Sequence, residues 1–242
     1  MRDYYNNPEV VLEHESDGVN RYVAKVFGWM FFGLLLTAMS TFTIVVAINI
    51  SETAAALVNS LMPLAFIVFL VQVFMVGALS LRITKMNTST AVLLYVTYAI
   101  VNGFTIGFIA LMYAGSGVVS AFLITAVSFG VMAIYGYKTK ADLTKAGNLL
   151  RMGLIGIIIL SVVNIFLGSG MMDFLICIAG LFIFLGLTAY DTKKIKTQYA
   201  QVAVSGGDVK LANNLAIIGA LMLYLDFINL FMFILRLMGG RR

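Results

Sequence analysis

The sequence LANNLAIIGALMLYLDFINLFMFILRL, residues 211–237, is a long apolar run that carries one carboxylate, Asp226, near its middle. Placing a charge at the centre of a bilayer costs from a few kcal/mol to roughly 10 kcal/mol or more. A carboxylate kept at that depth is therefore expected against a partner, in contact with water, or in its neutral form. Tyr224 and Asn229 add further polar groups to the same segment.

A second apolar run ends in Ala189-Tyr190-Asp191-Thr192 and is followed by lysines, which places Asp191 where a helix leaves the membrane. We expect Asp191 and Asp226 to face each other, with the remaining helices arranged around them. Two carboxylates brought close together share one proton. When both are ionised, such a pair is a candidate ligand set for a hard divalent cation such as calcium.

The composition requires lipid as the solvent. The chain has 242 residues, of which 61% are hydrophobic and 11% are charged, whereas a soluble domain has about 45–50% apolar and about 25% charged residues. We expect a polar cytoplasmic tail over residues 1–20 and one transmembrane domain over residues 21–242. The net charge of +5 does not indicate nucleic acid, because most basic residues lie in short loops.

Seven apolar runs have lengths close to the roughly 17–25 residues that a membrane-spanning helix needs. They are residues 26–50, 54–81, 90–113, 118–137, 149–167, 171–190 and 211–237. Strands of a membrane barrel alternate over only about 10 residues, so the sequence predicts an all-α membrane protein with seven transmembrane helices. Pro63 is expected to kink the second helix. Small residues are expected to let the third and fifth helices pack closely: Gly103, Gly107, Gly153 and Gly156.

Loops with Lys or Arg alternate with loops that have neither, which predicts a multi-pass protein with a cytoplasmic N-terminus. Seven crossings would leave Arg241 and Arg242 outside, so a last segment that re-enters and returns is an alternative.

The chemical candidates are carboxylates. The only histidine, His14, lies in the tail, and no phosphate-binding glycine loop or Cys/His cluster occurs. We expect no enzyme activity and no cofactor. An intramembrane aspartyl protease stays an alternative because of the Tyr190-Asp191 pair, although LYL before Asp226 lacks the glycines that would admit a substrate backbone. A membrane adaptor without transport is a third alternative.

Three segments resemble the Bax inhibitor-1 family, also called the TMBIM or lifeguard family. They are GALSLR at 77–82, AYDTKKI at 189–195 and LYLDFINLF at 223–231. The short tail is similar to that of bacterial members, which implies the bacterial cell membrane. The resemblance implies a seven-helix fold whose last helix is surrounded by the other six, and a pH-sensitive calcium leak. Calcium ions, protons and the bilayer are then the expected partners, while protein partners are unknown.

Carried over by motif, Asp191 and Asp226 are the proton-sensing, gating pair, and Arg82 is the latch that holds the Asp191 side when the path is closed. An arginine suits this role because its guanidinium pairs with a carboxylate through two hydrogen bonds. Tyr190, Tyr224 and Asn229 are the expected supporting polar groups.

The stretch between the two aspartates raises a geometric question. Residues 197–210 are expected to form a long loop, flexible at 204–208. A last helix beginning at residue 211 would place Asp226 about 22 Å along it. The two carboxylates then meet only if the last helix starts below the membrane, unwinds or tilts.

Overall fold

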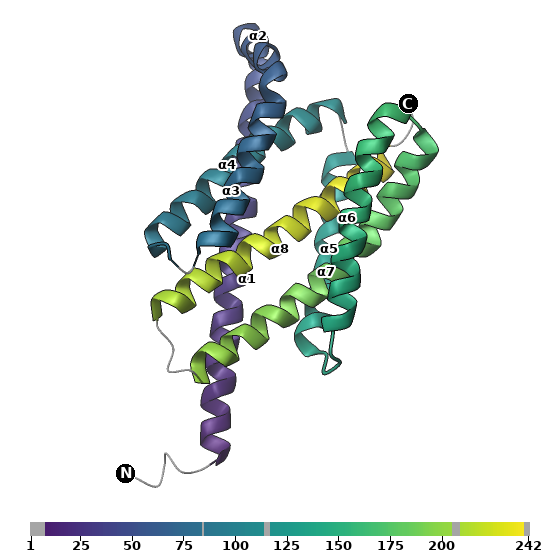
Figure 1. Ribbon diagram of the computed structural model, residues 1–242. Coiled ribbons are helices and arrows are strands. Elements are labelled where there is room, and N and C mark those ends of the chain that lie inside the picture. The colour runs from purple at the N-terminus through teal and green to yellow at the C-terminus, as the bar shows by residue number, and fades with distance from the viewer. Residues whose placement is uncertain (1–7, 84, 114–116, 205–208, 240–242) are drawn as a thin grey trace. The chain divides into compact units, whose positions relative to one another are not determined.

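The computed structural model describes residues 8–83, 85–113, 117–204 and 209–239, and the regular elements in these ranges are all helices (Figure 1). The elements are α1 (Pro8–Ile50), α2 (Glu52–Leu61), the 3₁₀ helix η1 (Met62–Leu64), α3 (Ala65–Arg82), α4 (Thr88–Met112), α5 (Gly117–Lys138), α6 (Thr144–Leu167), α7 (Gly170–Val204) and α8 (Val209–Met238). The all-α prediction is confirmed.

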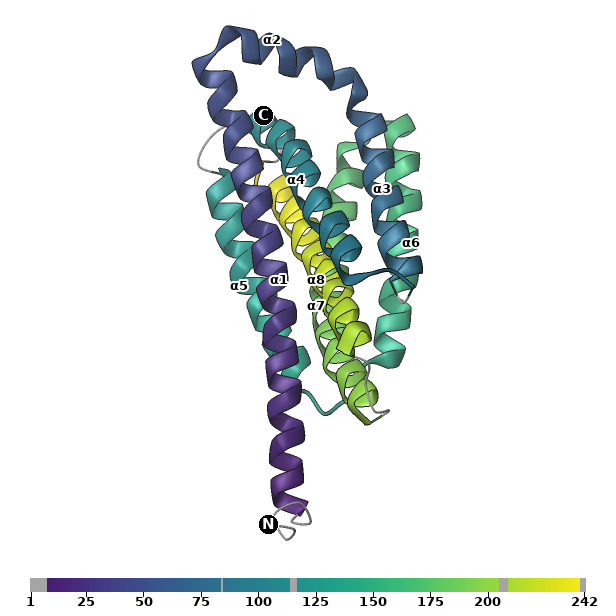
Figure 2. The same cartoon turned by 90° about the vertical axis from the view of Figure 1, so that its left-hand side faces the viewer.

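Within the described ranges, six segments are long and apolar enough to cross a membrane. They are Asp17–Ile50 of α1 and the apolar parts of α4, α5, α6, α7 and α8. The predicted helix over 54–81 is not continuous, and that expectation is wrong. Figure 2 shows α2 turning away from α1 and leading across to α3. The break contains Pro63, which lies in η1 and cannot continue an α-helix because it lacks an N–H and its ring collides with the preceding turn.

The chain divides into two compact units, and α7 and α8 contribute to both. Unit 1 contains Met1–Phe108 and Lys194–Leu221, and unit 2 contains Ile109–Lys193 and Met222–Arg242. Unit 1 thus holds α1, α2, α3 and most of α4, with the last part of α7 and the first part of α8. Unit 2 holds α5, α6, most of α7 and the last part of α8.

In unit 1, α1 and α4 make a close contact along small and hydroxyl side chains. A Cβ at Gly103 would collide with the α1 backbone at Thr37, and one at Gly107 would touch α1 further along. The Thr37 hydroxyl donates to the Ala99 carbonyl at 2.9 Å, and the Thr41 hydroxyl donates to the Gly103 carbonyl at 2.8 Å. The predicted packing role of both glycines is confirmed, because only small residues let two helix backbones approach this closely.

The start of α8 is fixed to the connection between α3 and α4, also in unit 1. Asn214 is buried, and its side-chain nitrogen donates to the carbonyls of Ile83 at 2.8 Å and Met86 at 3.0 Å. The Thr88 hydroxyl donates to the Asn214 side-chain oxygen at 2.8 Å. This one amide therefore satisfies two carbonyl groups of the α3–α4 connection, just after the last residue of α3.

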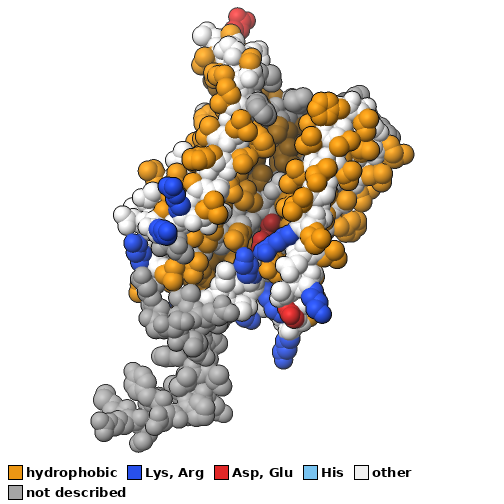
Figure 3. All heavy atoms as spheres, in the orientation of Figure 1, with side chains coloured by type: hydrophobic (Ala, Val, Ile, Leu, Met, Phe, Trp, Pro, Cys, Tyr) orange, Lys and Arg blue, Asp and Glu red, His pale blue; other side chains and the backbone are white. Residues whose placement is uncertain are grey.

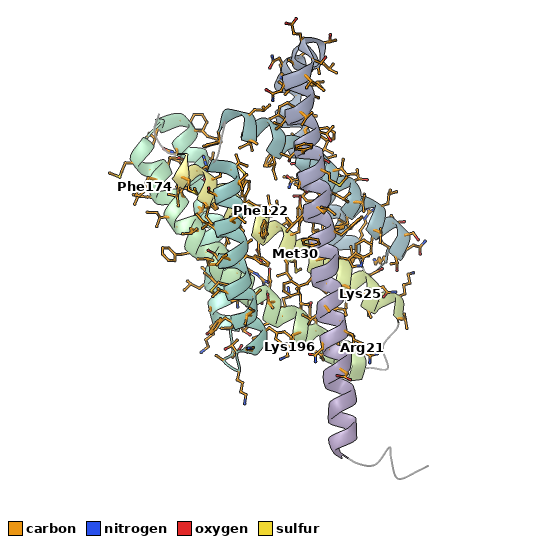
Figure 4. The ribbon with its side chains drawn as sticks, turned by 180° about the vertical axis from the view of Figure 1, so that it is seen from behind. Arg21, Lys25, Met30, Phe122, Phe174 and Lys196 are labelled. Atoms are coloured by element: carbon orange, nitrogen blue, oxygen red, sulfur yellow. The ribbon has the colours of Figure 1, made fainter. Side chains whose placement is uncertain are left out.

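Basic side chains of unit 1 gather at one end. Figure 4 shows Arg21 and Lys25 on α1 and Lys196 at a similar level on α7. The Lys25 ammonium donates to the Asn213 side chain in the first turns of α8 at 2.6 Å. Cationic groups from the N-terminal part of α1 and from the last part of α7 thus share the same end of this unit.

In unit 2, the last part of α8 packs against α5 through aromatic rings. The Phe227 ring lies 5.5 Å from the rings of both Phe122, labelled in Figure 4, and Phe129, in edge-to-face geometry. A Cβ at Gly136 of α5 would collide with the α7 backbone at Ala189. Helix α7 is therefore held against α5 by direct backbone approach, and α8 by aromatic contacts of the kind that stabilise membrane bundles through packing.

Helix α6 is the least buried of the candidate spans, with 6% of its apolar window buried. Figure 3 shows hydrophobic side chains covering its outward face. A helix that is apolar on its exposed face is suited to contact with lipid.

The structure resolves the question of how the two aspartates meet. Helix α7 continues past Asp191 to Val204, and α8 begins at Val209, so most of the expected loop over 197–210 is helical and that prediction is wrong. Residues 205–208 lie outside the described part of the chain. Asp191 is then about 20 Å from the end of α7 and Asp226 about 26 Å from the start of α8.

The two helices run antiparallel and side by side (Figures 1 and 2). A Cβ at Gly219 of α8 would touch Ile195 of α7 in unit 1, and one at Gly180 of α7 would collide with Phe233 of α8 in unit 2. Asp191 and Asp226 both lie in unit 2, where α7 and α8 pack against each other.

Candidate functional site

Asp226 is a buried carboxyl group on α8, in unit 2, with 4% of its surface exposed. Its Oδ2 atom is buried and accepts no hydrogen bond from any residue that the structure describes. An ionised carboxylate in such surroundings is strongly disfavoured unless it is paired. The group therefore requires a proton or a cation.

Asp191 of α7 and Arg151 of α6 accompany Asp226 in unit 2. Arg151 Nη2 lies 3.9 Å from Asp191 Oδ1, which is an ion pair but too long for a hydrogen bond. The Asp191 side chain is 12% exposed, whereas the Arg151 side chain is 46% exposed. Both charges act electrostatically on Asp226. The structure thus brings the two predicted aspartates into one site, while their predicted gating role stays a prediction.

A stack of side chains holds Arg151 in place. Its guanidinium carbon lies 4.8 Å from the centre of the Tyr190 ring, a geometry that attracts a cation to an aromatic face. The Tyr190 ring in turn occupies the space beside Gly147, one turn before Arg151 on α6, where a Cβ would collide with it. Tyr190, predicted as a supporting polar group, therefore contacts the site through its ring face.

Arg151 is the site residue that the sequence analysis missed. Arg151 lies at the start of the fifth predicted run, 149–167, where a basic residue is also typical of the charges that set membrane orientation. Helix α6 begins at Thr144, which places Arg151 inside the helix. The available signal was Asp142, two residues before Thr144, since aspartate is typical of the turn that precedes a helix.

The hydroxyl and amide groups near the carboxylates mostly bond to their own helices. The Thr188 and Thr192 hydroxyls, on either side of Asp191, donate to carbonyls one turn earlier at 2.8 and 2.7 Å. The Asn229 nitrogen donates to the Leu225 carbonyl at 2.7 Å. Predicted Tyr224 is fully buried in α8. These contacts leave the Asn229 side-chain oxygen as an acceptor beside the aspartates.

The predicted latch, Arg82, ends α3 in unit 1, and its side chain is exposed. Its pairing with Asp191 stays a prediction.

A cavity of about 510 Å³ lies among α6, α7 and α8 in unit 2. Most of its wall is apolar, and its polar lining residues are Arg151, Ser161, Asp191, Asp226 and Asn229. Among the described residues, no three His, Cys, Asp or Glu side chains come together as a metal cluster.

Long apolar helices that enclose two carboxylates and a guanidinium define the class of this chain, a multi-pass membrane protein with charged groups inside its apolar helices. The family described as "Inhibitor of apoptosis-promoting Bax1" matches this chain over residues 19–242. The chain belongs to the Bax inhibitor-1 family.

Bacterial relatives match nearly end to end. The chain is 40% identical over 230 residues to "Inner membrane protein YbhL" of Escherichia coli strain K12, covering 93% of this chain and 94% of that protein. It is 42% identical over 225 residues to a protein of Borreliella burgdorferi strain B31, covering 92% and 93%. It is 37% identical over 231 residues to protein RP147 of Rickettsia prowazekii strain Madrid E, covering 94% and 92%.

Proposed function

We propose that this protein is a pH-sensitive calcium-leak channel of the bacterial cell membrane and that the Asp191–Asp226 pair senses the protons that gate it. The observation that carries the proposal is the buried Asp226 Oδ2, which accepts no hydrogen bond from the described residues and lies beside Asp191 and Arg151 in a cavity wall. Intramembrane carboxylates commonly mark ion and proton pathways.

The charge balance explains how protons act on the site. With a proton on Asp226, the charges of Asp191 and Arg151 cancel and the site is neutral. Without that proton, the site carries one net negative charge and attracts a cation. Acid thus removes the attraction for calcium. Acid also weakens the attraction between the carboxylate pair and Arg82, the proposed latch. Release of this latch opens the path and increases the flux, so the two effects of acid oppose each other.

The seven-span arrangement with α8 innermost belongs to the same proposal. Its support is that 67% of the apolar window of α8 is buried, against 6–39% for the other candidate spans. The segment α2–η1–α3 supplies the additional crossing, because α3 alone is about 27 Å long and the hydrocarbon core is about 30 Å thick.

Calcium entry into liposomes that contain only the purified protein tests the function. A dye trapped inside reports calcium, and protein-free liposomes give the background. We expect flux through the wild type and through Asp173→Asn, which alters an exposed ion pair with Arg236 outside the cavity. Absence of flux at every pH between 8 and 5, with folded protein, would contradict the proposal and favour an adaptor. Cleavage of a transmembrane peptide, lost in Asp191→Ala, would favour the protease.

A further inference from the structure

The charges and the lining of the unit 2 cavity are complementary to one kind of ligand. Arg151 offsets Asp191, so Asp226 supplies the one net negative charge when both carboxylates are ionised. We propose that this cavity binds a protonated organic amine from the membrane, with the ammonium group at Asp226 and a compact apolar body in the cavity. The inference uses the same carboxylates as the proposed channel but requires no conduction.

The cavity has the size and access that such a ligand requires. The cavity volume of about 510 Å³ falls within the roughly 300–1,000 Å³ of small-molecule pockets. Lining residues include Leu154, Ile158 and Val162 of α6 and Leu225 of α8. Ile158 and Val162 line the cavity and are also exposed, so the apolar part of the cavity is open at the surface of the protein.

The cavity lining offers acceptors for each N–H group of an ammonium ion. The ammonium group has three N–H donors, and the cavity lining offers the Asp226 carboxylate, the Ser161 hydroxyl and the Asn229 side-chain oxygen as acceptors. A monovalent cation also cancels the single net charge and leaves none in the apolar interior.

Protons compete with the amine for the same carboxylate. The ionisable groups that act on Asp226 are Asp191 from α7 and Arg151 from α6. An aliphatic amine stays protonated between pH 5 and pH 8, because the lysine amine has a pKa of about 10.4. If Asp226 carries a proton, binding of the ammonium releases that proton to the solvent. Acid must therefore weaken binding.

The test uses two probes of the same shape and different charge, 1-adamantylamine and 1-adamantanol. Binding to the full chain in nanodiscs is measured by equilibrium dialysis at pH 8 and pH 5, with empty nanodiscs as background. We expect saturable amine binding that is at least about tenfold tighter than alcohol binding and weaker at pH 5. Asp226→Asn should weaken amine binding by about tenfold or more, whereas Asp173→Asn should not change it.

A second variant tests the cavity without altering a charge. Ile158→Trp adds volume at an exposed wall position, so it should fold and should reduce amine binding by filling the space. This variant, the alcohol probe and the pH comparison decide the question even if Asp226→Asn does not fold.

Equal binding of amine and alcohol, undiminished binding in folded Asp226→Asn, or no amine binding to the wild type would each overturn the inference. Amine binding by a protein without calcium flux would support this inference and reject the proposed channel. Calcium flux without amine binding would support the proposed channel and reject this inference.

Discussion

Arg151 and Asp191 form an ion pair between α6 and α7, with Nη2 of the arginine 3.9 Å from Oδ1 of the aspartate. The arginine also lies over the ring of Tyr190, the residue before Asp191. A guanidinium fixed in this way supplies a permanent positive charge beside the Asp191–Asp226 pair. In the proposed function, this charge sets how strongly the pair holds a proton or a cation.

Replacement of Arg151 should move the pH dependence of calcium flux. Arg151→Gln removes a positive charge that favours ionised carboxylates, so the pair should keep its proton to higher pH. We expect the midpoint of the flux profile to rise by about one to three pH units. Arg151→Lys keeps the charge and should shift the midpoint less, although a lysine lacks the planar group that stacks on a ring.

Lys145→Gln is the matched control, because Lys145 is an exposed cation in the first turn of the same helix. Liposome flux between pH 8 and pH 5 gives the midpoints. An Arg151→Gln midpoint equal to that of Lys145→Gln would show that Arg151 does not act on the pair.

Gly147→Ala should destabilise the protein, because the new Cβ would collide with the Tyr190 ring. Overpacking of this kind costs about 1–3 kcal/mol. Gly156→Ala makes the same change on the same helix where nothing lies within 4 Å, and it should be neutral or stabilising by about 0.5–1 kcal/mol. Thermal unfolding in detergent compares the two. Equal unfolding temperatures would mean that Tyr190 does not pack against Gly147.

These glycines also show what sequence spacing can and cannot predict. Small residues at helical spacing correctly predicted close contacts at Gly103 and Gly107, and at Gly153, where a Cβ would collide with Ile183. The same reasoning was wrong for Gly156, which faces open space. Spacing identifies a face that permits close approach, but the partner helix decides which positions on that face are used.

The candidate site also shows which residues sequence patterns can predict and which they cannot. Apolar runs interrupted by rare carboxylates predicted Asp191 and Asp226, because a charge in lipid is costly enough to be informative alone. Arg151 gave no such signal, since basic residues near helix ends also set membrane orientation. The continuous α7 over 197–204 was missed because polar helices that leave the membrane have the composition of loops.

Asp142 provides a pH test outside the membrane-spanning segments. The Thr144 hydroxyl donates to its Oδ1 atom at 2.6 Å and the Thr144 backbone N–H donates at 2.9 Å. These two hydrogen bonds lower the pKa of the Asp142 carboxyl below the usual aspartate value. A lowered folded-state pKa stabilises the fold above the unfolded-state pKa, and this contribution is lost as the pH falls through the lowered value.

Thr144→Ala removes the hydroxyl donor and should raise the pKa of Asp142 toward the usual value. Carbon-detected NMR titration of the labelled carboxyl measures it. Lys145→Gln serves as the control, because Lys145 has the smallest effect among the causes of the shift. A larger change in Lys145→Gln than in Thr144→Ala would show that charge, and not hydrogen bonding, sets this pKa.

The central claim is that Asp191 and Asp226 together sense the protons that gate calcium flux. The most direct measurement is the pH profile of calcium entry into liposomes, from pH 8 to pH 5, for wild type, Asp191→Asn and Asp226→Asn, with Asp173→Asn as the control. The account predicts that both cavity variants lose or shift the pH dependence while the control keeps the wild-type profile. A wild-type profile in folded Asp226→Asn would contradict the account.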